Sequence, residues 1–269
     1  MGKDRKYALL DTDFLYKTHL ARNDSNTLAD LVMGFEEYEY FCHEVVTEEL
    51  TRREINPNPY PWLNERIAEG RIKLFTDQAI LNELQRIYGE LATTVYMDLL
   101  KNSCEAFNAG FYDKYYGMLE HSESVNDVDG FLAILKRCDE CIPYQNGVGE
   151  KKSLVLLQLL EVLYGNEVYV FCSDDFKARQ SIAALFNPVS CISVLGVFYK
   201  LRKLGYDKAV MKEYYDCLTV SLKNQTDFKV WSDTGYQRVK VPISKVFDDL
   251  YDDKFLMLRN GDLRYKKGY

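Results

Sequence analysis

The chain has 269 residues, of which 34 are Lys or Arg and 41 are Asp or Glu, giving a formal net charge of −7. Its 47% hydrophobic and 14% aromatic residues are enough to build a buried core, which excludes a disordered chain. No uncharged apolar run approaches the roughly 18 residues of a membrane span, and no apolar segment follows the basic N-terminus. These features predict a cytoplasmic protein that makes no use of a membrane.

The charges are divided unevenly along the chain. Residues 1–150 carry 15 basic and 27 acidic groups, whereas residues 151–269 carry 19 basic and 14 acidic groups. The acidity of the whole argues against a protein that coats nucleic acid. It is compatible with an enzyme that holds nucleic acid through one basic patch.

Cysteine and histidine patterns give little support to a zinc site or a disulfide framework. The seven cysteines are odd in number and scattered, and Cys138 and Cys141 form the only CxxC pair. A structural zinc site needs about four ligands, and the chain has only three histidines. If a metal binds, we expect carboxylate ligands, which favour Mg²⁺ or Mn²⁺.

Hydrophobic periodicity predicts alternating strands and helices. In chain order we expect a strand at 7–10, helices at 13–20 and 27–34, a strand at 37–42, helices at 45–54 and 61–69, and a strand at 72–75. The pattern is helical from about 78 to 141, and then predicts a helix at 150–164, a strand at 168–172, a helix from 176, a strand at 190–195 and a helix at 196–204. Asn260-Gly261 lies between two short alternating segments, which predicts a β-hairpin.

Apolar strands that alternate with helices favour a parallel sheet covered on both faces. We therefore predict the α/β class, with three α/β/α layers around a central, mostly parallel sheet. The helical stretch 77–141 reads as an insertion, and residues 221–269 as a C-terminal extension that contains the hairpin. The main domain is then formed by residues 1–76 and 142–220.

Acidic residues follow two of the predicted strands. Asp11 and Asp13 come after the first strand, and Asp174 and Asp175 come after the strand at 168–172. In a parallel sheet such strand ends meet at one edge, where sites commonly form. A cluster of carboxylates there would repel, and a divalent cation would remove the repulsion and could activate water against a phosphodiester.

Each acidic residue also has a purely structural interpretation. Asp13 and Ser173 can be helix caps, and Glu150 can be a partner of a helix dipole after the glycine-rich turn that precedes it. Glu48 and Glu49 can belong to a solvated helix face.

Four segments together resemble the PIN-domain ribonuclease superfamily: LLDTDFLY (9–16), VVTEEL (45–50), GVGEKKSLVLLQLL (147–160) and FCSDDFKARQSIAALF (171–186). The similarity is greatest to the branch related to the toxins of toxin–antitoxin pairs, with its GxGE and DDxxAR motifs, and it covers residues 5–55 and 147–218. It implies a compact α/β/α fold and an endoribonuclease that uses Mg²⁺ or Mn²⁺. It also implies an RNA substrate, and an antitoxin-like protein or a second copy of the chain as partner.

Carried over position by position, the resemblance implies a set of site residues. The implied catalytic residues are Asp11, Glu49, Glu150 and Asp175. The implied metal ligands are Asp11, Glu150, Asp174 and Asp175, with 174 and 175 as alternatives for the last acidic position. Asp13 and Ser173 are implied to support the site. About 100 residues separate Glu49 from Glu150, more than in compact members. The insertion and the tail after about 220 have no counterpart in the minimal fold.

Basic residues beside these motifs are candidates for contact with RNA phosphates. The first candidates are Arg52, Lys151, Lys152, Lys177 and Arg179; Arg53, Lys200, Arg202 and Lys203 are further ones. Each can instead be ordinary surface charge, and Arg179 can be an ion-pair partner within the acidic cluster.

Two other functions compete with a nuclease. A phosphatase-like hydrolase of the haloacid dehalogenase class would use Asp11 as nucleophile and Asp13 as general acid, with Lys151 or Lys152 as the required lysine. A catalytically silent binding module would use the same fold for assembly, and the large insertion favours that idea.

Overall fold

The structure is a computed structural model that describes residues 6–267, apart from 25, 53–56, 122–126, 146, 166, 187–188, 223–227 and 232–237. Its centre is a five-stranded sheet with strand order β3-β2-β1-β4-β5, in which every neighbouring pair is parallel. The strands are β1 (Lys6–Leu10), β2 (Tyr38–His43), β3 (Ile72–Phe75), β4 (Val168–Cys172) and β5 (Val189–Ile192). The predicted α/β class with a central parallel sheet is confirmed.

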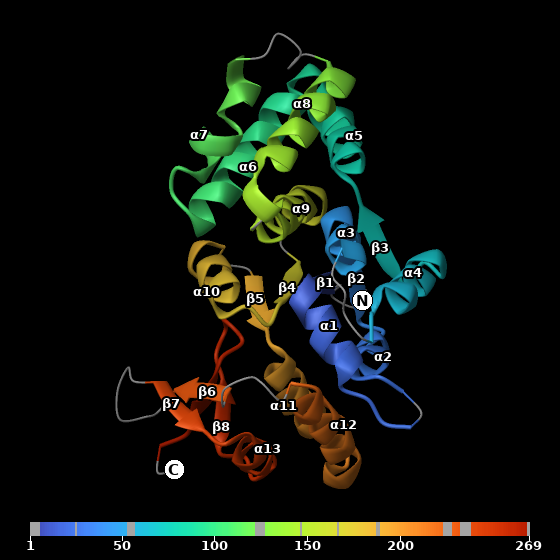
Figure 1. Cartoon of the computed structure of the whole chain (residues 1–269), viewed down its shortest axis with the longest axis vertical. Coiled ribbons are helices and arrows are strands. Elements are labelled where there is room, and N and C mark those ends of the chain that lie inside the picture. The colour runs from blue at the N-terminus through green and yellow to red at the C-terminus, as the bar shows by residue number, and fades with distance from the viewer. Residues whose placement is uncertain are drawn as a thin grey trace.

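Helices flank this sheet and extend the molecule at both ends (Figure 1). Those of the first half are α1 (Thr12–Leu20), α2 (Leu28–Met33), α3 (Glu44–Arg52), α4 (Tyr60–Ala68), α5 (Asp77–Tyr88), α6 (Ala92–Phe107), α7 (Phe111–Tyr115) and α8 (Val128–Cys141). Those of the second half are α9 (Val148–Tyr164), α10 (Phe176–Leu185), α11 (Val194–Lys203), α12 (Lys208–Ser221) and α13 (Ile243–Tyr251).

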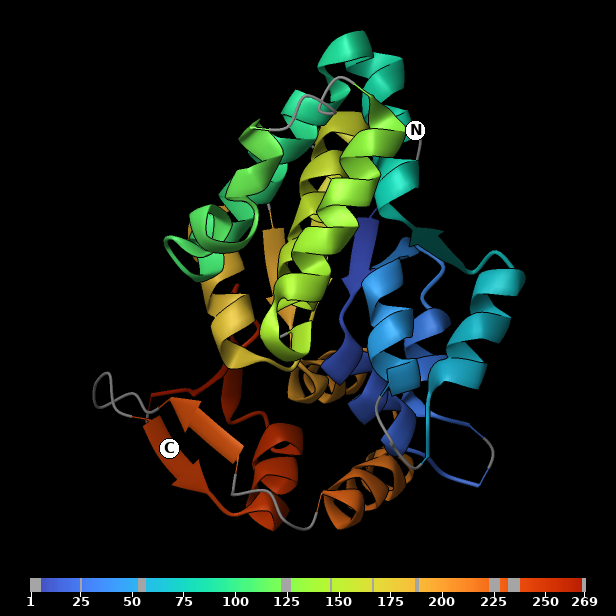
Figure 2. The same ribbon diagram turned by 45° about the horizontal axis from the view of Figure 1, so that its top comes forward.

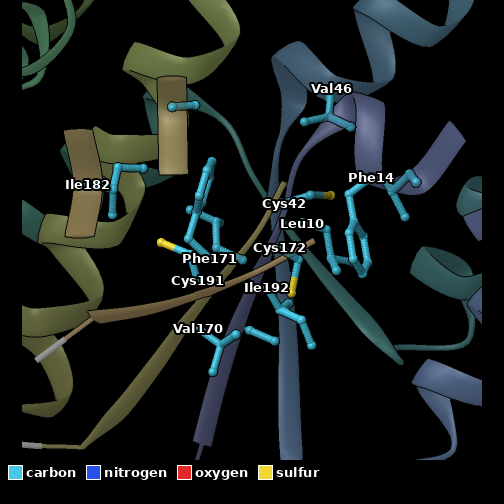
Figure 3. Packing of buried hydrophobic residues seen from close by; sticks show 14 of the residues in the cluster. Leu10, Phe14, Cys42, Val46, Val170, Phe171, Cys172, Ile182, Cys191 and Ile192 are labelled. Atoms are coloured by element: carbon cyan, nitrogen blue, oxygen red, sulfur yellow. The ribbon is translucent and has the colours of Figure 1, made fainter. Parts of the chain in front are cut away.

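Alternation along the strands divides the core into two layers. On one face of the sheet, Ala8 and Val170 lie with Phe14 of α1 and Val197 of α11 around a small apolar hollow. On the other face, Tyr7 stacks on Tyr164 of α9, with ring centroids 4.5 Å apart. Figure 3 shows side chains from neighbouring strands interleaved with those of the covering helices. Burial on both faces explains why the strands are apolar throughout.

The described residues of 77–141 form helices and short 3₁₀ turns and add no strand to the sheet. The helices α5 and α6 pack on each other, and α6 packs along α9. Figure 2 shows α5–α8 gathered around α9, above the sheet. The helical periodicity of this segment therefore predicted its secondary structure correctly.

The C-terminal region forms a second sheet, with order β7-β6-β9-β8. Its strands are β6 (Phe228–Trp231), β7 (Arg238–Val241), β8 (Phe255–Met257) and β9 (Leu263–Tyr265). The expected hairpin is confirmed, because β8 and β9 pair antiparallel around Asn260-Gly261. The expected strand 190–195 is corrected: β5 ends at Ile192, because the Ser193 side chain accepts the backbone N–H of Gly196 and caps α11. Among the described residues, no helix has the length and apolar character needed to span a bilayer.

Candidate active site

A cleft of about 560 Å³ opens at the carboxyl ends of β1 and β4. Half of its lining residues are acidic, and the lining comprises Asp11, Thr12, Asp13, Glu49, Arg52, Glu140, Ile142, Tyr144, Gly147, Gly149, Glu150 and Asp175. Since β1 pairs with β4 and also with β2, the segments that follow these three strands meet at one edge of the sheet. The cleft thus unites the four predicted catalytic carboxylates, Asp11, Glu49, Glu150 and Asp175, with the supporting residue Asp13.

Asp11 lies deepest in this group and is 7% exposed. The Ser173 hydroxyl donates a hydrogen bond of 2.8 Å to Oδ2 of Asp11. The backbone N–H of Asp11 donates to the carbonyl of Cys172. The pKa of Asp11 is raised to about 8, mainly by burial and to a smaller extent by the nearby carboxylates of Glu150, Asp13 and Glu49, while the hydrogen bond from Ser173 lowers it. The expected supporting role of Ser173 therefore rests on a direct contact.

The Gly147-Val148-Gly149 turn brings Glu49 and Glu150 to the same place. Gly147 has a φ of +76° and begins the turn into α9, a conformation that favours glycine. A Cβ atom at Gly149 would lie 2.6 Å from Oε1 of Glu49. The carboxylate of α3 therefore rests directly on the backbone next to Glu150, and only glycine leaves it that space.

The structure distinguishes the two adjacent aspartates that follow β4. Asp175 lines the cleft and caps α10 by accepting the backbone N–H of Ala178 at 2.8 Å. Asp174 instead forms an ion pair with Lys17 of α1 and accepts the backbone N–H of Val194 at 3.1 Å. Asp174 thus joins α1 to α11, and of the two alternatives for the last acidic position only Asp175 belongs to the cleft lining.

Three of the basic candidates are turned away from the cleft, which corrects their expected contact with RNA. Lys151 is 4% exposed, donates to the carbonyl of Gly147 at 2.8 Å, and lies 3.8 Å from the ring centre of Phe111. Lys152 is 1% exposed and pairs with Asp77 at 2.7 Å. Both are buried because α9 is enclosed on all sides by the sheet and the insertion helices.

Arg179 is the third buried cation and belongs to the attachment of the tail. Its guanidinium pairs with Asp262 at 2.9 Å and donates to the carbonyls of Asn260 and Ser173. Arg179 therefore forms an ion pair, but the expected partner within the acidic cluster is wrong, because the pairing carboxylate is Asp262 of the C-terminal loop.

The remaining basic candidates differ in position. Arg52 lines the cleft, and Lys177 is exposed at the start of α10 but outside the cleft lining. Lys200 donates to the hydroxyl of Tyr38, while Arg202 and Lys203 pair with Asp253. Arg53 lies outside the described residues.

Sequence reasoning missed several residues of the cleft. Glu140 at the end of α8 adds a further carboxylate, and Tyr144 adds a completely exposed ring. Thr12 also lines the cleft, and its buried hydroxyl has no hydrogen-bond partner among the described residues. Of these residues, only Thr12 could have been found from the sequence, because it directly follows Asp11. Glu140 and Tyr144 reach the cleft through the packing of the insertion, which no local sequence pattern indicates.

A second polar cluster lies behind the cleft, between α9 and the insertion. His43 Nε2 is 3.2 Å from Asp77 Oδ1, and Lys152 pairs with both Asp77 and Asp139. Burial alone would raise the pKa of Asp77, but the charges of Lys152 and His43 hold it well below its usual value. His43, Glu44 and Asp77 have ligand-type atoms within 4.8 Å of one another, but the protein's own cations and hydroxyls already satisfy Asp77.

The carboxylates of the cleft lie farther from one another than the ligand-type atoms of His43, Glu44 and Asp77 do. Within the described part of the chain, no three of them bring ligand atoms within 4.8 Å of one another. An oxygen-only donor set suits a hard divalent cation that keeps several waters and needs few direct ligands. The raised pKa of Asp11 and the unpartnered hydroxyl of Thr12 both fit a cation with its waters bound in the cleft.

Comparison with known proteins finds no match to this chain among protein-family models, curated proteins or solved structures.

Proposed function

We propose that this protein is a PIN-type ribonuclease that depends on Mg²⁺ or Mn²⁺ and hydrolyses RNA phosphodiester bonds in the acidic cleft. The observation that carries the proposal is the meeting of Asp11, Glu49, Glu150 and Asp175 around one cleft, although they come from segments up to 164 positions apart in the sequence. Asp13 and Glu140 add to the negative charge of this lining.

The bound cation would supply a water of lowered pKa and would stabilise charge on the phosphate. Asp11 and Glu150 are the residues that would hold it, with Asp175 on the side of β4. Ser173 orients the Asp11 carboxylate through its 2.8 Å hydrogen bond. Arg52, at the rim, provides a cation for the substrate phosphate.

A phosphatase that uses Asp11 as nucleophile finds less support. Such an enzyme needs a lysine beside the nucleophile, and the two lysines in question point elsewhere: Lys151 to Phe111, and Lys152 to Asp77 and Asp139. Glu49 and Glu150 would also have no role. A silent binding module accounts less well for a complete set of carboxylates around Asp11.

The test is cleavage of an end-labelled RNA by the wild-type protein and by Glu150→Gln and Asp11→Asn. We expect Mg²⁺- or Mn²⁺-dependent cleavage by wild type, none in EDTA, and a loss of most activity in both variants. Arg86→Ala, an exposed change on α5 outside the cleft lining, is the control for handling and folding.

Four outcomes would contradict the proposal. Activity that survives EDTA, or full activity of Glu150→Gln, would remove the metal mechanism. A phospho-aspartyl adduct on Asp11, with Glu150→Gln active, would indicate the phosphatase instead. A wild-type protein that is folded but inactive on RNA of several sequences would favour the binding module.

A further inference from the structure

The cleft is flanked by two further hollows of opposite electrostatic character. One, of about 460 Å³, shares Glu140 with the cleft, and its lining includes Glu44, Glu48, Asp77 and Asp139. The other, of about 330 Å³, shares Ile142 with the cleft and has no carboxylate in its lining, which consists of Asn108, Ala109, Gly110, Phe111, Lys114, Tyr115, Ile142 and Pro143. We call the first the acidic hollow and the second the aromatic hollow.

We propose that the aromatic hollow, together with the exposed ring of Tyr144, is a subsite for an unpaired nucleotide that continues from the cleft. The inference rests on the proposed function and extends it, because it assigns the insertion a direct part in binding the substrate. A strand of RNA that leaves the cleft through the acidic hollow would bring its phosphates against four or more carboxylates. On the other side it meets Lys114 and aromatic rings.

Tyr144 has the geometry of a stacking platform. Its ring is 100% exposed, although the residue lies between the buried Ile142 and the turn that begins α9. Its φ of +54° is unusual for a bulky residue and directs the backbone out of the 3₁₀ turn that it occupies. Strained backbone that presents a side chain to solvent is a feature of binding sites.

The floor of the aromatic hollow is held in place by the core. Phe111 is 8% exposed and lies between Lys151, 3.8 Å from its ring centre, and Tyr115, 4.8 Å away between ring centroids. Lys151 also donates to the carbonyl of Gly147, at the start of α9. The buried lysine thus ties the aromatic hollow to the turn that presents Glu150, which gives the two sites a fixed separation.

Lys114 supplies the charge for an adjoining phosphate. Its side chain is exposed on α7, with the ammonium 4.8 Å from the ring centre of Tyr115. In the acidic hollow, Lys136 is likewise exposed but lies among carboxylates. These two lysines are a matched pair, alike in exposure and different in the charge of their surroundings.

The experiment measures binding separately from cleavage, in Glu150→Gln protein with Mg²⁺. A short single-stranded RNA with one 2-aminopurine base is titrated, and anisotropy and fluorescence quenching are followed. We expect Tyr144→Ala to weaken binding about tenfold and to abolish quenching at one position, because the stack between the base and the aromatic ring is lost. Tyr144→Phe should restore both. Lys114→Ala should weaken binding and reduce its salt dependence, whereas Lys136→Ala should change neither.

Fully paired RNA should bind more weakly than the single strand, and Tyr144→Ala should not affect it, because a stacked base must be unpaired. Equal effects of Lys114→Ala and Lys136→Ala, or unchanged binding by Tyr144→Ala with a wild-type melting temperature, would overturn the subsite. If wild type cleaves RNA while these variants bind normally, the subsite fails and the nuclease stands. If binding depends on Tyr144 but wild type does not cleave, the nuclease fails and the subsite stands.

Discussion

At the scale of single residues, Asp11 combines deep burial with several like charges. Among the described residues, the Asp11 carboxylate accepts one side-chain hydrogen bond, from Ser173. Its ionised form is therefore poorly solvated. A carboxyl group in this position is held in the protein at an electrostatic cost, which a bound cation would remove. That cost can be measured without any substrate.

The first prediction concerns stability against pH in EDTA. The pKa of Asp11 is about 8 in the folded protein and near 3.8 in the unfolded chain, so between these values the folded state holds the extra proton. Its contribution to stability is therefore full below about pH 4 and is lost as pH rises to about 8, by at most about 6 kcal/mol. Asp11→Asn should flatten this part of the curve and be the more stable protein at pH 8, as urea unfolding would show. A wild-type curve as flat as that of the variant would contradict the raised pKa.

Gly149 allows a second test at this scale. Its missing Cβ leaves room for Oε1 of Glu49, and the far end of that flexible side chain can move if a methyl group is added. We expect Gly149→Ala to displace the Glu49 carboxylate, to weaken Mn²⁺ binding about tenfold or more, and to change the free energy of unfolding by less than about 1 kcal/mol. Gly117→Ala is the control, because nothing lies within 4 Å of its Cβ position. Unchanged Mn²⁺ affinity, measured by calorimetry, would show that Glu49 takes no part in metal binding.

The sequence allowed prediction of those site residues that belong to local patterns. Asp11 and Asp175 follow apolar strands, and Glu150 follows a glycine turn, so strand ends and a turn place them without knowledge of packing. It did not predict Glu140 or Tyr144, which reach the cleft only through the packing of the insertion against α9. It also misplaced Lys152, because a charged residue beside an acidic motif suggests a surface. The apolar character of α9 on all faces was the signal that its lysines would be buried.

At the scale of elements, α9 is the axis of the molecule. It packs on β2, α3, α5 and α6, and its first turns carry both the cleft residue Glu150 and the two buried lysines. Lys152 holds Asp77 at the start of α5 and Asp139 near the end of α8. Tyr96 of α6 donates to Asp77, and Tyr116 donates to Asp139 at 2.6 Å. One ammonium group thus joins α9 to three helices of the insertion, α5, α6 and α8.

The third prediction compares the two buried lysines. Burial alone would lower the pKa of Lys152, but Asp77 and Asp139 outweigh it and raise that pKa, whereas burial lowers the pKa of Lys151. Lys152→Met leaves two carboxylates without their cation, and we expect it to cost about 3–5 kcal/mol in unfolding free energy. Lys151→Met removes contacts with the rings of Phe107 and Phe111 and one hydrogen bond, and should cost about 1–2 kcal/mol.

Chemical denaturation of both variants measures the difference. The double change Lys152→Met with Asp77→Asn should recover part of the loss, since it removes one of the uncompensated charges. Equal costs for the two lysines would show that the ion pairs with Asp77 and Asp139 contribute no more than packing does.

At the scale of the whole molecule, the insertion contributes to the cleft lining directly, and the C-terminal extension is linked to the cleft through hydrogen bonds. The insertion supplies Glu140 to the cleft lining. The C-terminal loop contacts the segment below the cleft through Arg179. That guanidinium joins Asp262 to the carbonyl of Ser173, whose hydroxyl in turn donates to Asp11. Gly261 makes the approach possible, because a Cβ there would lie 2.9 Å from the carbonyl oxygen of Cys191. The sequence predicted the hairpin that carries this loop but not its docking, which depends on contacts between distant segments.

The last prediction uses the melting temperature of the protein to detect metal binding. A cation that binds the native cleft and not the unfolded chain stabilises the protein by about 2.7 kcal/mol at one hundred times its dissociation constant. For a chain of this size that corresponds to a rise in melting temperature of about 5–10 °C. We expect Mn²⁺ to produce it in wild type, with EDTA reversing it, and to produce little of it in Asp11→Asn or Glu150→Gln. Glu44→Gln should respond as wild type does, because Glu44 belongs to the cluster around Asp77 and not to the cleft. If Glu44→Gln loses the response while Glu150→Gln keeps it, the cation binds behind the cleft, and the proposed active site is misplaced.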